Sequence, residues 1–305
     1  MSFSLSVKRE LFEKENEARH CDIAELAAVI NHGADVIETA DGLSIQINSD
    51  RMLCQKFRVL LKKLFSVGVN YTVTLGARVD GAGDVKRILS AAGLYTEADG
   101  AVNRCISPFV VASGCCKRAY VRGAFLAAGV MSDPEKTYHA EFVNASEELA
   151  SALSAILESF ELNARRTRRK DSFILYLKDS GEITDLLNVM EAHNSLMEMA
   201  NVRIVKDVRN RLNRNVNAEA ANLGKTITAS VKQLEDIRLI TDSKGISFLN
   251  DQLAEAAALR LKHHDLSLKE IGGMMTPPVS KSGVNHRFRK IGEIADDIRK
   301  SKEEN

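Results

Sequence analysis

The sequence has no tryptophan and only 4 prolines, and aromatic residues fill 5% of its 305 positions. A hydrophobic core must therefore come mainly from Leu, Ile, Val and Ala, and the scarcity of proline favours helices. No stretch approaches the roughly eighteen consecutive apolar residues that cross a membrane, and the N-terminal segment MSFSLSVKRELFEKE lacks the apolar centre of a signal peptide. We therefore expect a cytoplasmic protein with no membrane partner.

An excess of charge of either sign is also missing. The 42 Lys and Arg residues nearly balance 41 Asp and Glu residues, which gives a net charge of +1. A surface that binds nucleic acid must then be a local basic patch, with acidic residues elsewhere. The length suits two domains, and 45% hydrophobic with 27% charged residues is ordinary for a globular protein.

Cysteine motifs are absent as well. The 5 cysteines are odd in number and form no CxxC pair. We therefore expect neither a disulfide framework nor a zinc site, and no metal or cofactor of any kind. The adjacent Cys115 and Cys116 are either a redox-active pair or small apolar side chains at a helix start, and the sequence favours the second interpretation. The five positions are Cys21, Cys54, Cys105, Cys115 and Cys116.

The first 205 residues contain the same predicted succession of helices and strands twice. Each copy begins with an apolar helix that ends at a glycine, continues with a hairpin and a second helix, and returns to strand. The first copy has predicted helices at 22–32, 53–64 (capped by Ser49) and 84–92, and strands at 36–37, 43–47 and 71–75. The second has helices at 116–128, 146–160 (capped by Ser146) and from about 182, and strands at 130–131, 138–143, 164–169 and 173–177. We interpret this as an α+β domain over residues 1–205 built by duplication of an αββα-type unit, with repeats at about 18–110 and 115–205.

The composition changes after this domain. Residues 206–224 form a basic, polar linker or linker helix, and only helices are predicted from 225 to 305. The clearest motif lies at about 266–299, where Ser267 and Glu270 form a capping box and Pro277-Pro278 breaks the helix. Ser280 then caps a second helix. Two helices joined by a short turn, and preceded by a third helix that packs on them, predict an all-α domain with a helix-turn-helix.

The second helix of this motif has the side chains that DNA recognition requires. No acidic residue lies between Glu270 and Glu293. Basic and amide side chains in the first turns of such a helix bond phosphates and base edges, and the helix N-terminus favours a phosphate oxygen. The candidate DNA-binding residues are Ser280, Lys281, Ser282, Asn285, His286, Arg287, Arg289 and Lys290. The alternative is a solvated basic face on a helical domain that binds a protein partner.

Two long segments resemble the WhiA family of bacterial DNA-binding regulators. They are CCKRAYVRGAFLAAGVMSDPEKTYHAEF at 115–142 and TPPVSKSGVNHRFRKI at 276–291, and the similarity extends to the N-terminal SFSLSVKREL. The resemblance implies a LAGLIDADG homing-endonuclease-like domain followed by a helix-turn-helix. It also implies nucleoid-associated transcription regulation in cell division and chromosome segregation, and in sporulation in some relatives.

The same resemblance argues against catalysis. Active LAGLIDADG enzymes carry an acidic residue just before the glycine that ends each motif helix, and this pair holds the catalytic metal ions. The matching positions here are His32 and Ala128, and neither is a carboxylate. Asp35 and Asp133 lie close by, but their strand and turn contexts make them poor substitutes. We therefore expect a degenerate motif and no enzyme activity, with a residual DNA endonuclease as the least favoured alternative.

A second basic run lies in the later strands of the duplicated domain. It is either a second DNA surface, an edge-strand guard against strand addition, or a docking surface for a protein partner or the C-terminal domain. Its residues are Arg165, Arg166, Arg168, Arg169 and Lys170. Double-stranded DNA is thus the expected partner. A scaffold that recruits a protein through the N-terminal domain is the main alternative function.

Overall fold

The computed structural model describes residues 2–39, 42–71, 76–96 and 100–303. The chain forms two compact units, an N-terminal unit over residues 1–206 and a C-terminal unit over residues 207–305. Among the described residues, no helix is both long and apolar enough to cross a membrane.

The first repeat of the N-terminal unit is one antiparallel sheet with helices. The strand order is β1-β2-β4-β3. Its elements are α2 (Arg19–Gly33), β1 (Ala34–Thr39), β2 (Gly42–Ile47), α3 (Arg51–Phe65), β3 (Asn70–Tyr71), β4 (Ala77–Val79) and α4 (Ala82–Ala91). The predicted helices are therefore confirmed. The cap of α3 is a correction, because the Asp50 side chain, and not Ser49, accepts the hydrogen bond from the Leu53 amide.

The second repeat has the same topology. Its strand order, β7-β8-β10-β9, matches that of the first repeat position by position. Its elements are α5 (Gly114–Ala128), β7 (Gly129–Met131), β8 (Ala140–Asn144), α6 (Glu147–Glu158), β9 (Arg165–Arg169), β10 (Ser172–Leu177) and α7 (Ser180–Val189). The duplication is confirmed, although each repeat carries two hairpins and so is αββαββα, longer than the αββα unit expected from sequence.

The sequence did not predict strand β4, a helix before the first repeat or a hairpin between the repeats. Helix α1 (Phe3–Glu13) precedes the first repeat and buries Phe3, Val7 and Leu11, which recur at helical spacing. A small hairpin of β5 (Tyr95–Thr96) and β6 (Ala101–Val102) joins the repeats. Parts of the expected first repeat, namely Asp41 of its turn and Val73 and Leu75 of its last strand, lie outside the described residues.

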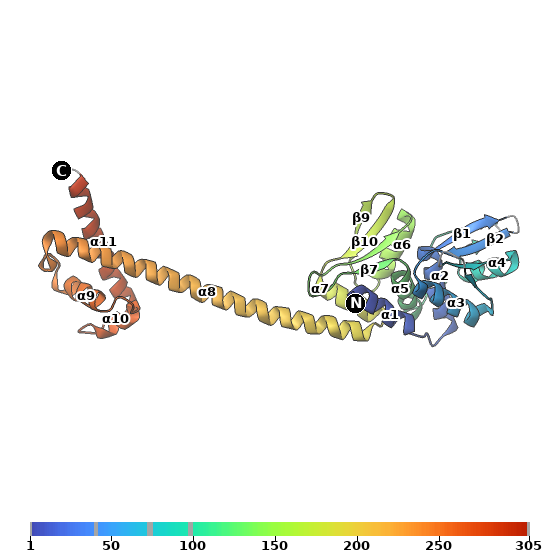
Figure 1. Cartoon of the computed structure of the whole chain (residues 1–305), viewed down its shortest axis with the longest axis horizontal. Coiled ribbons are helices and arrows are strands. Elements are labelled where there is room, and N and C mark those ends of the chain that lie inside the picture. Colours follow the sequence, from blue (N-terminus) through green and yellow to red (C-terminus); the bar gives the residue numbers. More distant parts are fainter. Residues whose placement is uncertain (1, 40–41, 72–75, 97–99, 304–305) are drawn as a thin grey trace. The chain divides into compact units, whose positions relative to one another are not determined.

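The two repeats meet through α2 and α5, which lie side by side between the two sheets (Figure 1). Small residues allow this close approach. A Cβ on Gly123 of α5 would lie 2.5 Å from the Glu25 carbonyl oxygen of α2 and 2.9 Å from the Ala28 Cβ. The Glu25 carboxylate is fully buried at the same interface, where its Oε1 lies 3.0 Å from Lys56 Nζ and 3.8 Å from Arg122 Nε.

The helix α8 (His193–Lys244) begins in the N-terminal unit and ends in the C-terminal unit. The basic segment 206–224 is therefore helical throughout, and the first part of the helical region expected from residue 225 is the end of α8. No proline interrupts the segment, and almost all of its residues are exposed, so its polarity marks a solvent-exposed helix. The remaining elements are η1 (Ile246–Phe248), α9 (Asp251–Lys262), α10 (Leu268–Met274) and α11 (Lys281–Glu303).

Candidate nucleic-acid interface

The end of α8 and helices α9, α10 and α11 share one hydrophobic core. Ile237 of α8, Ala256 of α9, Ile271 of α10 and Val284 of α11 are all fully buried in it. The short helix α10 begins with the predicted capping box, in which Ser267 Oγ accepts from the Glu270 amide at 3.3 Å and Glu270 Oε2 accepts from the Ser267 amide at 2.8 Å.

The turn between α10 and α11 is held tightly against α10. The Val279 amide donates to the Gly272 carbonyl oxygen at 2.9 Å. A Cβ on Gly272 would lie 2.2 Å from the Val279 carbonyl oxygen and 3.0 Å from Val284 Cγ2, so only glycine fits. Ser280 then caps α11 through its Oγ, which accepts from the Gly283 amide at 3.3 Å. These contacts fix the direction in which α11 leaves the turn.

The structure places most of the candidate DNA-binding side chains on the solvent-exposed face of α11. Seven of the eight are exposed, and they occupy the cap and the first turns of the helix. The buried positions Val284, Phe288 and Ile291 form the opposite face. The seven exposed residues are Ser280, Lys281, Ser282, Asn285, His286, Arg289 and Lys290.

Arg287 is the exception, and its expected role changes. Its side chain is only 15% exposed, and its guanidinium reaches α9, where Nη1 lies 3.3 Å from Glu255 Oε2 and 3.4 Å from the Gln252 carbonyl oxygen. Nη1 also lies 3.2 Å from Met275 Sδ. Three residues after the buried Val284, position 287 lies on the flank of the buried face. Arg287 therefore joins α11 to α9 and is not presented to solvent.

Charge changes sign along α11. The segment from Lys281 to Lys290 contains no acidic residue, whereas Glu293, Asp296 and Asp297 follow within two turns. Arg289 Nε lies 3.6 Å from Glu293 Oε1 across one turn, at the point where the sign changes. We name the exposed segment 280–290 the basic turns. A polyanion is attracted to these turns and repelled by the next two.

Helix α8 adds a residue that the sequence analysis missed. Lys225 and Thr226 line a hollow of about 220 Å³ together with Lys281 and Asn285 of α11. Lys225 thus lies beside the first turn of the basic turns. Its position in a long polar helix gives no sign of this proximity, because only the packing of α8 against the three-helix motif creates it.

The second basic run forms an exposed edge. β9 is the outer strand of the β7-β8-β10-β9 sheet, and all five of its residues are exposed. Arg166 Nη1 donates to Ser151 Oγ at 3.1 Å, and the guanidinium carbon of Arg168 lies 5.4 Å from the centre of the Phe173 ring. The strand is thus an edge with bulky basic side chains, as the edge-guard interpretation and the DNA-surface interpretation both require.

The ends of the two motif helices carry no carboxylate. His32 Nε2 lies 3.4 Å from the Tyr120 hydroxyl oxygen, and Asn31 Nδ2 donates to the same oxygen at 3.0 Å. Burial, with a smaller effect of the nearby Arg104 charge, lowers the pKa of His32 to about 3, so its ring is neutral. Ala128 has no donor atom. Asp133 Oδ1 accepts from the Glu135 amide at 2.9 Å, which is a structural use of aspartate in a turn.

Two family models match the chain. The model described as the WhiA LAGLIDADG-like domain matches residues 117–209, and the model described as the WhiA C-terminal HTH domain matches residues 212–295. The second match contains α9, α10 and most of α11. The expected order of a LAGLIDADG-like domain followed by a helix-turn-helix is therefore confirmed.

Curated relatives match over nearly the whole chain. A protein of Lachnoclostridium phytofermentans, named probable cell division protein WhiA, is 43% identical over 98% of this chain and 100% of its own length. A protein of Clostridium beijerinckii with the same name is 41% identical over 99% and 100%. The crystal structure of full-length DUF199/WhiA from Thermatoga maritima, at 23% identity, covers 97% of this chain and 99% of its own with a TM-score of 0.57, and so shares its fold. The chain belongs to the WhiA family.

Proposed function

We propose that the protein is a DNA-binding regulator of cell division that grips duplex DNA with the basic turns and does no chemistry on it. The observation that carries this proposal is the charge of the first half of α11. Basic and amide side chains are exposed there, and the first acidic residue of the helix is Glu293. The names of the curated relatives support the link to cell division.

The contact follows from the chemistry of the exposed side chains. Lys281, Arg289 and Lys290 neutralise phosphates, which supplies affinity and makes it salt-dependent. Asn285 offers the paired donor and acceptor that match an adenine edge in the major groove. Lys225, on the far side of the hollow, reaches a phosphate beside the same groove. Regulation of transcription, association with the nucleoid and a role in chromosome segregation or sporulation belong to this proposal as its cellular consequences.

The lack of catalysis rests on the chemistry of the motif ends. Metal-assisted hydrolysis of a phosphodiester needs carboxylates that hold divalent ions close to the scissile bond. His32 and Ala128 stand at the two positions that would supply them. Incubation of the protein with plasmid DNA and Mg²⁺ should leave the plasmid intact.

Binding of a labelled duplex by the full chain, followed by fluorescence anisotropy, tests the proposal. The double variant R289Q/K290Q should weaken binding by roughly tenfold or more at physiological salt, because two phosphate contacts are lost. The matched control is K300Q/K302Q, which removes the same charge from exposed positions at the far end of the same helix and should bind like the unmodified protein. Equal loss in both variants would mean that net charge, and not the basic turns, governs binding.

A second candidate surface is β9 with the adjoining Lys170. Its exposed arginines suit either DNA phosphates or an acidic face of a protein partner. If β9 binds a protein partner, the N-terminal unit recruits that partner while the C-terminal unit places the complex on DNA.

A further inference from the structure

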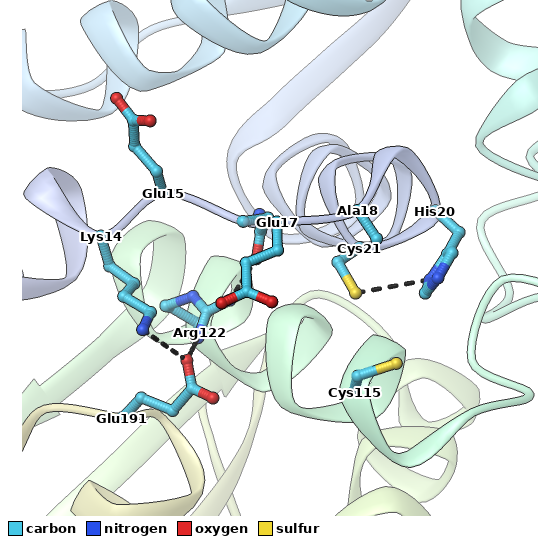
Figure 2. A pocket seen from close by; sticks show the side chains of 10 residues that line it. Lys14, Glu15, Glu17, Ala18, His20, Cys21, Cys115, Arg122 and Glu191 are labelled. Atoms are coloured by element: carbon cyan, nitrogen blue, oxygen red, sulfur yellow. Dashed lines mark hydrogen bonds and ion pairs between the residues drawn. The ribbon is translucent and has the colours of Figure 1, made fainter.

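Four side chains with metal-binding atoms meet at the first turns of α2 and α5. His20 Nδ1 lies 3.1 Å from Cys116 Sγ and 3.4 Å from Cys21 Sγ. The Nδ1 atom and the three sulfurs, including that of Cys115, all lie within 4.8 Å of one another. We name these four residues the Cys₃His cluster. Figure 2 shows His20, Cys21 and Cys115 converging beside a cavity of about 300 Å³.

These separations fit a tetrahedral zinc site. Zinc–sulfur bonds of about 2.3 Å and zinc–nitrogen bonds of about 2.0 Å place sulfurs about 3.8 Å apart and sulfur and nitrogen about 3.5 Å apart. The two distances to His20 Nδ1, 3.1 and 3.4 Å, lie slightly below the second value, and the limit of 4.8 Å leaves only small side-chain shifts for the sulfurs. We propose that His20, Cys21, Cys115 and Cys116 bind one Zn²⁺ ion and that this ion joins the two repeats of the N-terminal unit.

The environment of the cluster is consistent with a bound cation. Cys21 and Cys116 are buried, whereas His20 and Cys115 are exposed and give an ion a route from solvent. Burial, a hydrogen bond that the Cys21 thiol donates to Cys115, and electrostatic repulsion from the neighbouring sulfurs raise the pKa of Cys21 to about 12, and burial also raises the pKa of Cys116. A divalent cation at the cluster would stabilise the thiolates that bind it, and each ligating thiol would release its proton to solvent when the ion binds.

A zinc site explains the histidine better than a disulfide does. A disulfide would use two sulfurs and leave the third thiol and the imidazole without a role. Soft sulfur and imidazole ligands select zinc over magnesium or calcium, which prefer oxygen. The two ligand pairs, His20-Cys21 and Cys115-Cys116, lie at corresponding starts of the paired helices, so one ion ties the two repeats together where α2 and α5 begin.

Metal analysis of the full chain, purified with reductant and with zinc supplied, tests this proposal. We expect about one zinc per chain. The variants C115S and C116S should lose nearly all of it and H20Q most of it. The matched control is C105S, an exposed cysteine outside the cluster, which should keep it. Co²⁺ in place of zinc should give the visible absorption of a tetrahedral thiolate site. A strong zinc chelator should lower the melting temperature of the unmodified chain by about 10 °C and leave that of C115S unchanged.

Two results would overturn the proposal. One is a protein without zinc in which all five thiols react with a thiol reagent after unfolding. The other is a protein without zinc whose mass is lower by two hydrogens, which identifies a disulfide. Because Cys115 is exposed, C115S should fold even where C116S does not, so the comparison with C105S stands in either case.

Discussion

The contrast between Arg287 and Arg289 is the sharpest consequence of the structure for the C-terminal unit. Both lie within the basic turns of α11, but only Arg289 is exposed to solvent. The Arg287→Ala variant removes a half-buried ion pair with Glu255 and the hydrogen bond to the Gln252 carbonyl oxygen. Exposed pairs contribute less than about 1 kcal/mol and fully buried ones more, so we expect a loss of about 1–2 kcal/mol in the free energy of unfolding.

That loss should lower the melting temperature of a unit of this size by about 5–10 °C. All five tyrosines lie before residue 180 and the chain has no tryptophan, so intrinsic fluorescence follows the N-terminal unit alone. Arg287→Ala should therefore shift the thermal transition seen by far-ultraviolet circular dichroism and leave the transition seen by tyrosine fluorescence in place. Combined with Glu255→Gln in a double-mutant cycle, it should give a coupling of about 1 kcal/mol.

The Arg289→Ala variant should leave the stability almost unchanged and weaken DNA binding. Its pair with Glu293 spans one exposed turn and contributes at most about 0.5 kcal/mol to stability. It should reduce the slope of log affinity against log salt by about 1, through the loss of one phosphate contact. The reasoning would be refuted if Arg287→Ala left the circular dichroism transition unchanged and reduced the salt slope as much as Arg289→Ala.

Three further predictions concern stability. Gly123→Ala should cost about 2 kcal/mol or more, because the new Cβ meets backbone 2.5 Å away, whereas Gly83→Ala, with nothing within 4 Å, should stabilise its helix slightly; urea unfolding measures both. His32 stays neutral in the folded chain, with its pKa lowered to about 3, but the unfolded chain gains a proton below about pH 6.5. The free energy of unfolding should thus fall by up to about 1.4 kcal/mol per pH unit as the pH drops from 6.5 towards 3. The His32→Gln variant should make this free energy, measured by urea unfolding, less dependent on pH. Ser267→Ala should cost about 1 kcal/mol by removing the capping box with Glu270, which thermal melts will detect.

Local features of the sequence predicted much of the architecture. The capping box of Ser267 and Glu270, the cap at Ser146 and the glycine that ends the helix before the first sheet all act within a few residues. The duplicated order of helices and strands is likewise visible in alternating and helical apolar spacing. Among the missed elements, strands β5 and β6 are two residues long and too short to produce such a pattern.

What depended on tertiary packing could not be predicted in the same way. Cys21 and Cys115 lie far apart in the chain, and their neighbours His20 and Cys116 form no known zinc spacing, so only the pairing of α2 with α5 brings the four side chains together. Lys225 lies beside Lys281 only because α8 packs on the C-terminal motif. The partial burial of Arg287 could have been predicted from the sequence, since its spacing from Val284 places it on the flank of the buried face.

The central claim, that the basic turns carry DNA binding, is tested most directly by comparing the two basic surfaces in the full chain. The salt dependence of anisotropy with a labelled duplex should be measured for R289Q/K290Q on α11 and for R165Q/R169Q on β9, which remove equal charge from exposed positions. We expect the first variant to reduce the log–log salt slope by about 2 and the second to leave it unchanged. A reduced slope in the β9 variant with an unchanged slope in the α11 variant would contradict the claim and place the DNA surface on the N-terminal unit.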